Sequence, residues 1–189
     1  MLSPADRQVA LDIAARAAIA PLREGRRWLP EVSTLPVDLA RPGACFVTLR
    51  ACGDLLGCIG SLEPRLPLAL DIAHNAAAAA FDDPRLPPLS LRDISVADIH
   101  VSVLGSLQPL SASGPADLER TLRPGTDGLL VESPGHRATF LPSVWEQLGD
   151  ATAFVAALWR KAGLVPGSWP AGVRLHRYQV EEFGRALSA

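Results

Sequence analysis

A thiol flanked by glycines is the feature of this sequence most suited to chemistry: Cys58 lies in the run Gly57-Cys58-Ile59-Gly60. Glycine inside a strand usually marks a bulge or the close approach of a ligand or another backbone. A cysteine becomes a nucleophile or redox centre when a nearby cation favours its thiolate. The run therefore predicts a ligand-binding or catalytic site in which Cys58 is the reactive or substrate-contacting group, with Gly57, Ile59 and Gly60 around the ligand.

The direction of the Cys58 side chain depends on the register of the hairpin that carries it. If Gly53-Asp54 is a two-residue turn, Cys58 faces Leu49 on an apolar face, and the thiol is then a small core hydrophobe. One extra loop residue turns the strand over, because side chains alternate between faces, and places Cys58 beside Thr48. The sequence leaves both registers open.

Several polar residues are candidate partners of this thiol. His74 and Asn75 lie on an otherwise apolar predicted helix, where a polar pair either forms hydrogen bonds in the core or orients Cys58. Arg85 follows that helix and can supply positive charge. The sequence offers further possible neighbours that it does not place relative to Cys58, namely Arg50, Arg65 and His100.

The other patterns argue against several function classes. The histidines lie in separate predicted elements without ligand spacing, so we expect no metal site. The sequence has no Gly-x-x-x-x-Gly-Lys loop, which argues against a nucleotide site, and no Gly-x-Ser-x-Gly elbow, which argues against an esterase. We expect no cofactor. A net charge of −2 disfavours nucleic-acid binding. Three cysteines with no secretion signal and no membrane-length apolar run predict free thiols and a cytoplasmic location.

Strands and helices occur in two uneven clusters rather than as a steady alternation, so the predicted fold class is α+β, with mixed or antiparallel sheets and flanking helices. A chain of 189 residues fits one large domain or two interlocked subdomains. We expect one domain over residues 1–189, with a smaller subdomain at about 98–150. The ranges that carry this prediction are a first helix from Pro4 that Pro21 ends or kinks, strands 44–50 and 55–62, a helix 68–81, a strand 99–104, a short helix 117–122, a hairpin 128–141, helices 143–148 and 151–162, and a closing strand 173–183.

Four stretches together resemble the AMMECR domain family, which supplies component A of the AmmeMemoRadiSam systems, and they occur in the order typical of that family. They are Gly53-Asp-Leu-Leu-Gly-Cys-Ile-Gly-Ser-Leu-Glu-Pro64, Ala79-Ala-Phe-Asp-Asp-Pro-Arg-Leu-Pro-Pro-Leu89, Leu122-Arg-Pro-Gly-Thr-Asp-Gly-Leu-Leu130 and Thr139-Phe-Leu-Pro-Ser-Val-Trp-Glu146.

The resemblance implies a mixed α+β fold, association with a Memo-like metalloprotein and a radical-SAM protein, and no firmly assigned reaction. We therefore expect a component of an uncharacterised modification pathway with a ligand or catalytic site around Gly57–Gly60. The alternative is a non-catalytic adaptor for the same partners with Cys58 in the core, so enzymatic activity is left open. One departure matters: Leu56 stands where the family typically has arginine, which removes an anion clamp or thiolate partner.

Overall fold

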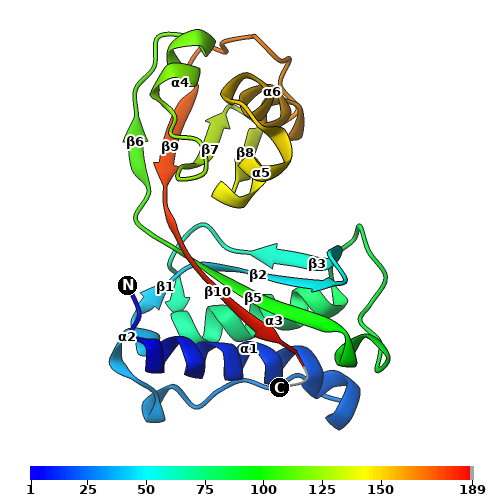
Figure 1. Ribbon diagram of the computed structural model, residues 1–189. Helices are drawn as coiled ribbons and strands as arrows, with labels where there is room; N and C mark the ends of the chain where they lie inside the picture. The colour runs from blue at the N-terminus through cyan, green and yellow to red at the C-terminus, as the bar shows by residue number, and fades with distance from the viewer. Residues whose placement is uncertain (188–189) are drawn as a thin grey trace. The chain divides into compact units, whose positions relative to one another are not determined.

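The computed structural model describes residues 1–187 and divides the chain into two compact units, one formed by residues 1–104 with the segment from Glu181, the other by Gly105–Val180. Figure 1 shows the elements of both units. Those of the first unit are α1 (Pro4–Glu24), α2 (Val37–Ala40), β1 (Pro42–Gly43), β2 (Cys45–Ala51), β3 (Asp54–Gly60), β4 (Leu66–Pro67), α3 (Leu68–Phe81), β5 (Ala97–Leu104) and β10 (Val180–Ala186), with the 3-10 turns Val32–Thr34 and Asp93–Ser95.

Helix α1 begins and ends at sequence signals. The Ser3 side chain accepts a hydrogen bond from the Asp6 amide, which caps the helix start. Gly25 closes it with a φ of 69°, a left-handed conformation that glycine adopts without strain. The helix continues through Pro21 to Glu24, so Pro21 does not end it; lacking an amide N–H, Pro21 cannot donate to the carbonyl one turn earlier.

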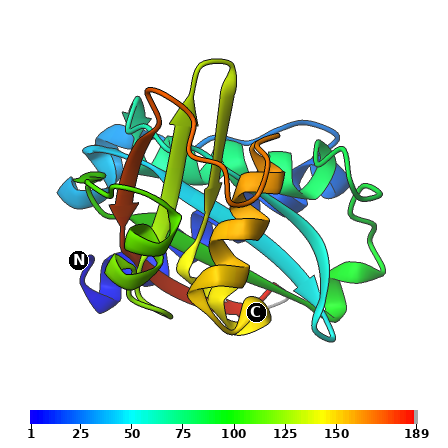
Figure 2. The same cartoon turned by 90° about the horizontal axis from the view of Figure 1, so that it is seen from above.

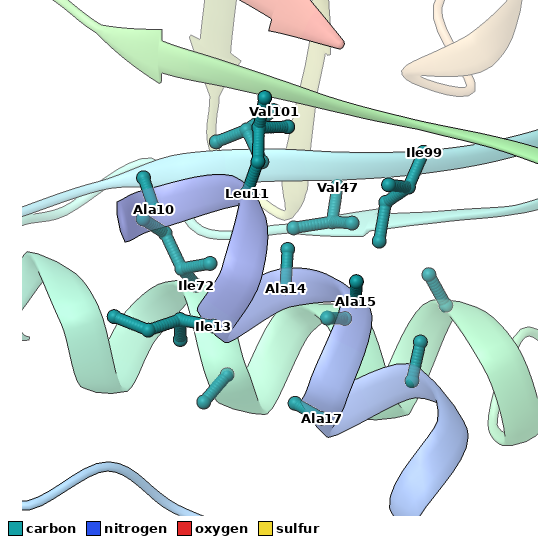
Figure 3. Close-up of a cluster of buried hydrophobic side chains, with 14 of the residues drawn as sticks. Ala10, Leu11, Ile13, Ala14, Ala15, Ala17, Val47, Ile72, Ile99 and Val101 are labelled. Atoms are coloured by element: carbon teal, nitrogen blue, oxygen red, sulfur yellow. The ribbon is translucent and has the colours of Figure 1, made fainter. Parts of the chain in front are cut away.

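One face of a sheet packs on two helices in the first unit. The strand order is β10-β5-β2-β3, and α1 and α3 both cover the same side of this sheet (Figure 1). Val47, Leu49 and Ile99 are fully buried against the helices. Figure 3 shows small side chains of α1, among them Ala14, in the same buried cluster as Val47 and Ile99 of the sheet. We call this side the core face of the sheet and the opposite side its outer face.

The second unit has its own sheet and its own core. Its strand order is β6-β9-β7-β8, and α6 lies beside the β7–β8 hairpin in Figures 1 and 2. Trp145 stacks on Phe154 with ring centroids 3.8 Å apart. The elements are β6 (Gln108–Leu110), α4 (Pro115–Thr121), β7 (Gly128–Ser133), β8 (His136–Phe140), the 3-10 turn Pro142–Val144, α5 (Trp145–Leu148), α6 (Ala151–Lys161) and β9 (Arg174–Tyr178).

The observed fold confirms the α+β class, with antiparallel pairing in both large sheets where register is defined. The predicted strand at 173–183 is in fact two strands, β9 and β10, which belong to different sheets. The second unit begins and ends later than the expected 98–150. It begins at Gly105 because β5 pairs with β2 of the first unit, and it ends at Val180 because α6 and β9 complete the second core. Within residues 1–187, no helix has the length and apolar character needed to cross a bilayer.

Candidate functional site

The turn before β3 is one residue earlier than the Gly53-Asp54 turn considered from the sequence. Ala51 pairs with Asp54, so Cys52 and Gly53 form the loop. Both have positive φ, 52° and 91°, which matches the primed turns that suit the twist of a hairpin. Continuing from this turn without interruption, the register would place Cys58 opposite Val47, on the core face.

A bulge at Leu56 changes that outcome. Arg50 pairs with Leu55 but Leu49 pairs with Gly57, so Leu56 is an extra residue in β3. An extra residue turns the following side chains to the other face. Cys58 consequently pairs with Thr48 on the outer face, and the extra residue lies in the strand rather than in the loop.

The Cys58 thiol is half-buried, whereas Val47 and Leu49 on the core face have no exposed surface. The Thr48 hydroxyl lies 3.3 Å from the sulfur and donates a hydrogen bond to it. Cys58 is not one of the residues of the buried core cluster, which instead contains Cys45. The structure therefore supports the outer-face register, in which the thiol is a polar surface group in contact with a hydroxyl donor.

Two side chains of the loop after α3, Asp83 and Arg85, form hydrogen bonds with the backbone of Cys58, and we call this pair the clasp. The Cys58 amide donates to Asp83 Oδ2 at 3.0 Å, and Arg85 Nη2 donates to the Cys58 carbonyl at 3.1 Å. Arg85 Nε and Nη2 also bond the two oxygens of Asp83 at 2.8 and 2.6 Å. Since β3 is the edge strand of its sheet, this clasp satisfies backbone groups that the sheet leaves unpaired.

The charges of the clasp compensate each other. Hydrogen bonds from Arg85 hold the pKa of the Asp83 carboxyl far below its usual range, although burial acts in the opposite direction. Asp83 in turn raises the pKa of Arg85. The Asp83 side chain is 2% exposed and that of Arg85 58%. Arg85 is thus next to Cys58, as predicted, but it stands beside the thiol as half of an ion pair rather than as an uncompensated cation.

Protein atoms fill the space beside both glycines. A methyl group on Gly57 would overlap the Ala79 carbonyl oxygen of α3, and one on Gly60 would overlap the Phe46 ring. The glycines therefore permit a close helix–strand approach and the packing of an aromatic ring. The prediction that the two glycines leave room for a ligand is therefore wrong. The position of Cys58 on the outer face does not depend on that prediction.

Asn75 and His74 lie apart from the thiol they were expected to orient. Asn75 is buried and its amide donates to Asp71 Oδ2 at 3.0 Å and to the Cys45 carbonyl at 3.2 Å. Asp71 also accepts from the Cys45 amide and from Ser61. His74 is exposed. This buried network surrounds Cys45, whose thiol pKa is raised by burial and by the Asp71 carboxylate.

A row of polar side chains crosses the outer face instead. Thr48 pairs with Cys58 on one side and with His100 on the other, so the three side chains share that face. His100 Nδ1 is 3.8 Å from Glu182 Oε1 of β10. Gly184 gives the ring room, because a side chain there would collide with the imidazole. We call Cys58, Thr48, His100 and Glu182 the outer-face row.

The row contains a thiol, a hydroxyl, an imidazole and a carboxylate, the residue types of nucleophilic catalysis. The imidazole and the thiol are separated by two strand spacings, roughly 10 Å between backbones. They can act together on a substrate group that lies over Thr48 rather than through a direct hydrogen bond. Among the described residues, no three His, Cys, Asp or Glu side chains form a group suited to a metal ion.

Sequence reasoning missed Thr48, Asp83 and Asp71 as site residues. Asp71 is an acidic residue in an otherwise apolar helix, a position that requires a buried partner, and this signal was present in the sequence. Asp83 directly precedes Pro84, a position typical of a turn, and nothing in its residue type marked it as a partner of Cys58. Thr48 was named only as the neighbour of Cys58 in one of the two registers, and its role depends on the Leu56 bulge, which lies next to Gly57.

Comparisons with known proteins agree with this fold. The AMMECR1 family model matches residues 12–183. A protein of Methanothermobacter thermautotrophicus is 37% identical over 89% of this chain and 89% of its own length. A protein of Thermofilum pendens is 35% identical over 89% of this chain and 85% of its own length.

A solved structure is also similar. The crystal structure of the uncharacterized protein PH0010 from Pyrococcus horikoshii superposes with a TM-score of 0.90 at 29% identity, covering 97% of this chain and 93% of that protein. The family match extends over both units and includes the β3 strand and the loop that clasps it. This chain therefore belongs to the AMMECR1 family.

Proposed function

We propose that this protein is a component of a modification pathway, acting with a Memo-like metalloprotein and a radical-SAM protein, and that Cys58 contacts the substrate. The observation that carries the proposal is the position of the thiol: it lies half-buried on the outer face, next to a hydroxyl donor. Its backbone is fixed on both sides by Asp83 and Arg85. Such a fixed geometry suits a group that must meet a substrate in one orientation.

The proposed role of Cys58 is that of a nucleophile or covalent anchor. His100, with Glu182 near its ring, is the group on the same face suited to exchange a proton with a bound substrate. Arg85 positions Cys58 through the backbone. Leu56, at the position of the family's arginine, packs partly buried against the core, so the proposal assigns no anion contact to that position.

The test uses the organism that makes the protein. Chromosomal Cys58→Ser and His100→Gln variants are compared with a deletion strain by untargeted mass spectrometry of metabolites and proteins. We expect both variants to reproduce the changes seen in the deletion strain. Cys52→Ser is the matched control, because Cys52 is an exposed turn residue, and it should resemble the wild type.

The second candidate function is a non-catalytic adaptor for the same partners. The observation that favours it is the packing at Gly57 and Gly60, which accounts for both glycines without a ligand. An adaptor predicts that the deletion strain shows changes that Cys58→Ser and His100→Gln do not reproduce.

A further inference from the structure

The second unit contains a polar cavity of about 280 Å³, remote in sequence from Cys58. It is bounded by the segment that leads into β6, by the Arg123–Asp127 loop after α4, and by the end of β9. Cavities that bind small molecules usually measure about 300–1,000 Å³. This cavity is slightly smaller than that range, a size that suits a compact ligand.

The one carboxylate among the residues that line the cavity is already saturated. Asp127 has no exposed surface and accepts bonds from Arg123 Nη2 at 2.6 Å and from its Nε and backbone amide at 3.1 Å. The Asp127 carbonyl accepts from Trp145 Nε1 at 2.7 Å. Because this ion pair neutralises Asp127 within its own loop, the acid does not repel an incoming anion.

Arg177 is the third charged residue of the lining, after Arg123 and Asp127. Its Nε is shielded from solvent and has no hydrogen-bond partner among residues 1–187. Arg177 pairs in register with Gln108 and with the core residue Leu129, so its side chain starts on the helix-covered face of the sheet. A buried guanidinium donor without a partner is costly, and an oxyanion is the ligand that would satisfy it best.

The rest of the lining is compatible with negative charge. Gln108, Gln179 and Ser106 supply neutral hydrogen-bonding groups. The Tyr178 hydroxyl donates to the Phe140 carbonyl and shares a hydrogen bond with Thr139. Burial raises the pKa of Tyr178 to about 12, so it stays neutral at physiological pH. The lining thus carries two guanidinium groups against one neutralised carboxylate.

We propose that this cavity binds a small-molecule oxyanion, a phosphate or carboxylate group, through Arg177 and the face of Arg123 that Asp127 does not occupy. The proposal is independent of the function proposed for Cys58, and it rests on the cavity, the unpartnered Nε and the charges of its lining.

Calorimetric titration of the full-length protein tests it with three probes: inorganic phosphate, glycerol 3-phosphate and succinate, each at ionic strength matched with sodium chloride. We expect saturable binding of at least one probe with a stoichiometry of one. Arg177→Gln should weaken that binding by roughly tenfold or more, as the loss of a charge-assisted hydrogen bond does. The probe that binds most tightly distinguishes phosphate, phosphate ester and carboxylate ligands.

The matched control is Arg174→Gln on the same strand, because the Arg174 side chain is 74% exposed and its Nη2 lies 3.8 Å from Glu132 Oε2. The Arg174→Gln protein should bind the probe with the affinity of the wild type. Cys58→Ser should also bind normally, which separates this cavity from the outer-face row. If Arg177→Gln does not fold, Arg177→Lys retains the charge without the Nε donor and should still weaken binding. No saturable binding of any probe, or equal affinity in the folded Arg177 variant, overturns the proposal.

Discussion

Backbone contacts, more than side-chain contacts, define the position of Cys58. Asp83 and Arg85 bond its amide and its carbonyl, whereas Thr48 provides the one side-chain bond to its sulfur among the described residues. Asp83 is the central residue of this arrangement, because it is almost fully buried and bonds both Cys58 and Arg85. Its removal should therefore loosen the edge strand next to the thiol.

Asp83→Asn should lower the free energy of unfolding by about 2 kcal/mol at pH 7, the typical loss for hydrogen bonds to a charged group. Arg85 is exposed and can regain water, so the main loss is at the Cys58 amide. Urea denaturation of both proteins measures the difference. Asp93→Asn is the control, since the Asp93 carboxylate accepts hydrogen bonds from the amide and the hydroxyl of Ser90 in an exposed turn; equal losses in the two variants would contradict the role of Asp83.

Acid should remove the contribution of Asp83. Its pKa is depressed in the folded state by Arg85, so the folded protein binds this proton less readily than the unfolded chain. The stabilisation is complete above the ordinary carboxyl pKa of about 4 and is lost as the pH falls below it. The stability difference between wild type and Asp83→Asn, followed by urea denaturation from pH 7 to pH 3, should therefore shrink below about pH 4. A difference that stayed constant over that range would exclude an ionised Asp83 as its source.

At the scale of elements, the sequence predicted which segments form strands and helices but not the register that orients the thiol. The run of mostly apolar residues predicted a helix over 68–81, and the structure has α3 with the same bounds. Gly57 indicated that a bulge was possible in this strand, but the sequence did not show its exact position, which decides the face that Cys58 occupies. That position involves the packing of β3 on β2 and α3, where Gly57 meets the Ala79 carbonyl. Packing of that kind is a tertiary effect that local residue preferences do not contain.

The close approach of β3 to α3 can be tested directly. Gly57→Ala should destabilise the protein by about 3 kcal/mol or more, because the added methyl group meets a backbone oxygen that has no rotamer with which to move away. Gly114→Ala is the matched control: its φ of 170° is extended and nothing lies within 4 Å of the added carbon. Thermal unfolding of the two variants measures the effect. Similar midpoints would show that Gly57 is not packed against α3.

At the scale of the molecule, the chain builds two separate cores. The first contains residues of α1, α3 and the β10-β5-β2-β3 sheet, and the second contains residues of α4, α6 and the β6-β9-β7-β8 sheet. The length of the sequence left one large domain and two subdomains both open. The sequence did not assign the C-terminal strands correctly, since residues 173–183 contain no glycine or proline to show where one strand ends and the next begins in another sheet.

Leu129→Ala should therefore act mainly on the second unit. Leu129 is fully buried there, and removing a buried leucine side chain typically costs about 3 kcal/mol. Hydrogen exchange should show faster exchange in β7 and β9 with little change in α3. Leu49→Ala, in the first core, should give the reverse pattern. Equal loss of protection in both units for either variant would contradict two separate cores.

Alkylation of the native protein measures the accessibility of the Cys58 thiol most directly. Iodoacetamide labelling at pH 7.5, followed by peptide mass spectrometry, reports Cys45, Cys52 and Cys58 in one experiment, with exposed Cys52 and buried Cys45 as internal references. We predict that Cys58 in the folded protein reacts more slowly than Cys52 and at least roughly tenfold faster than Cys45. Cys45 should react only after unfolding, because the local openings that expose a core group are rare. Protection of Cys58 equal to that of Cys45 would place the thiol in the core and contradict its role as a substrate contact.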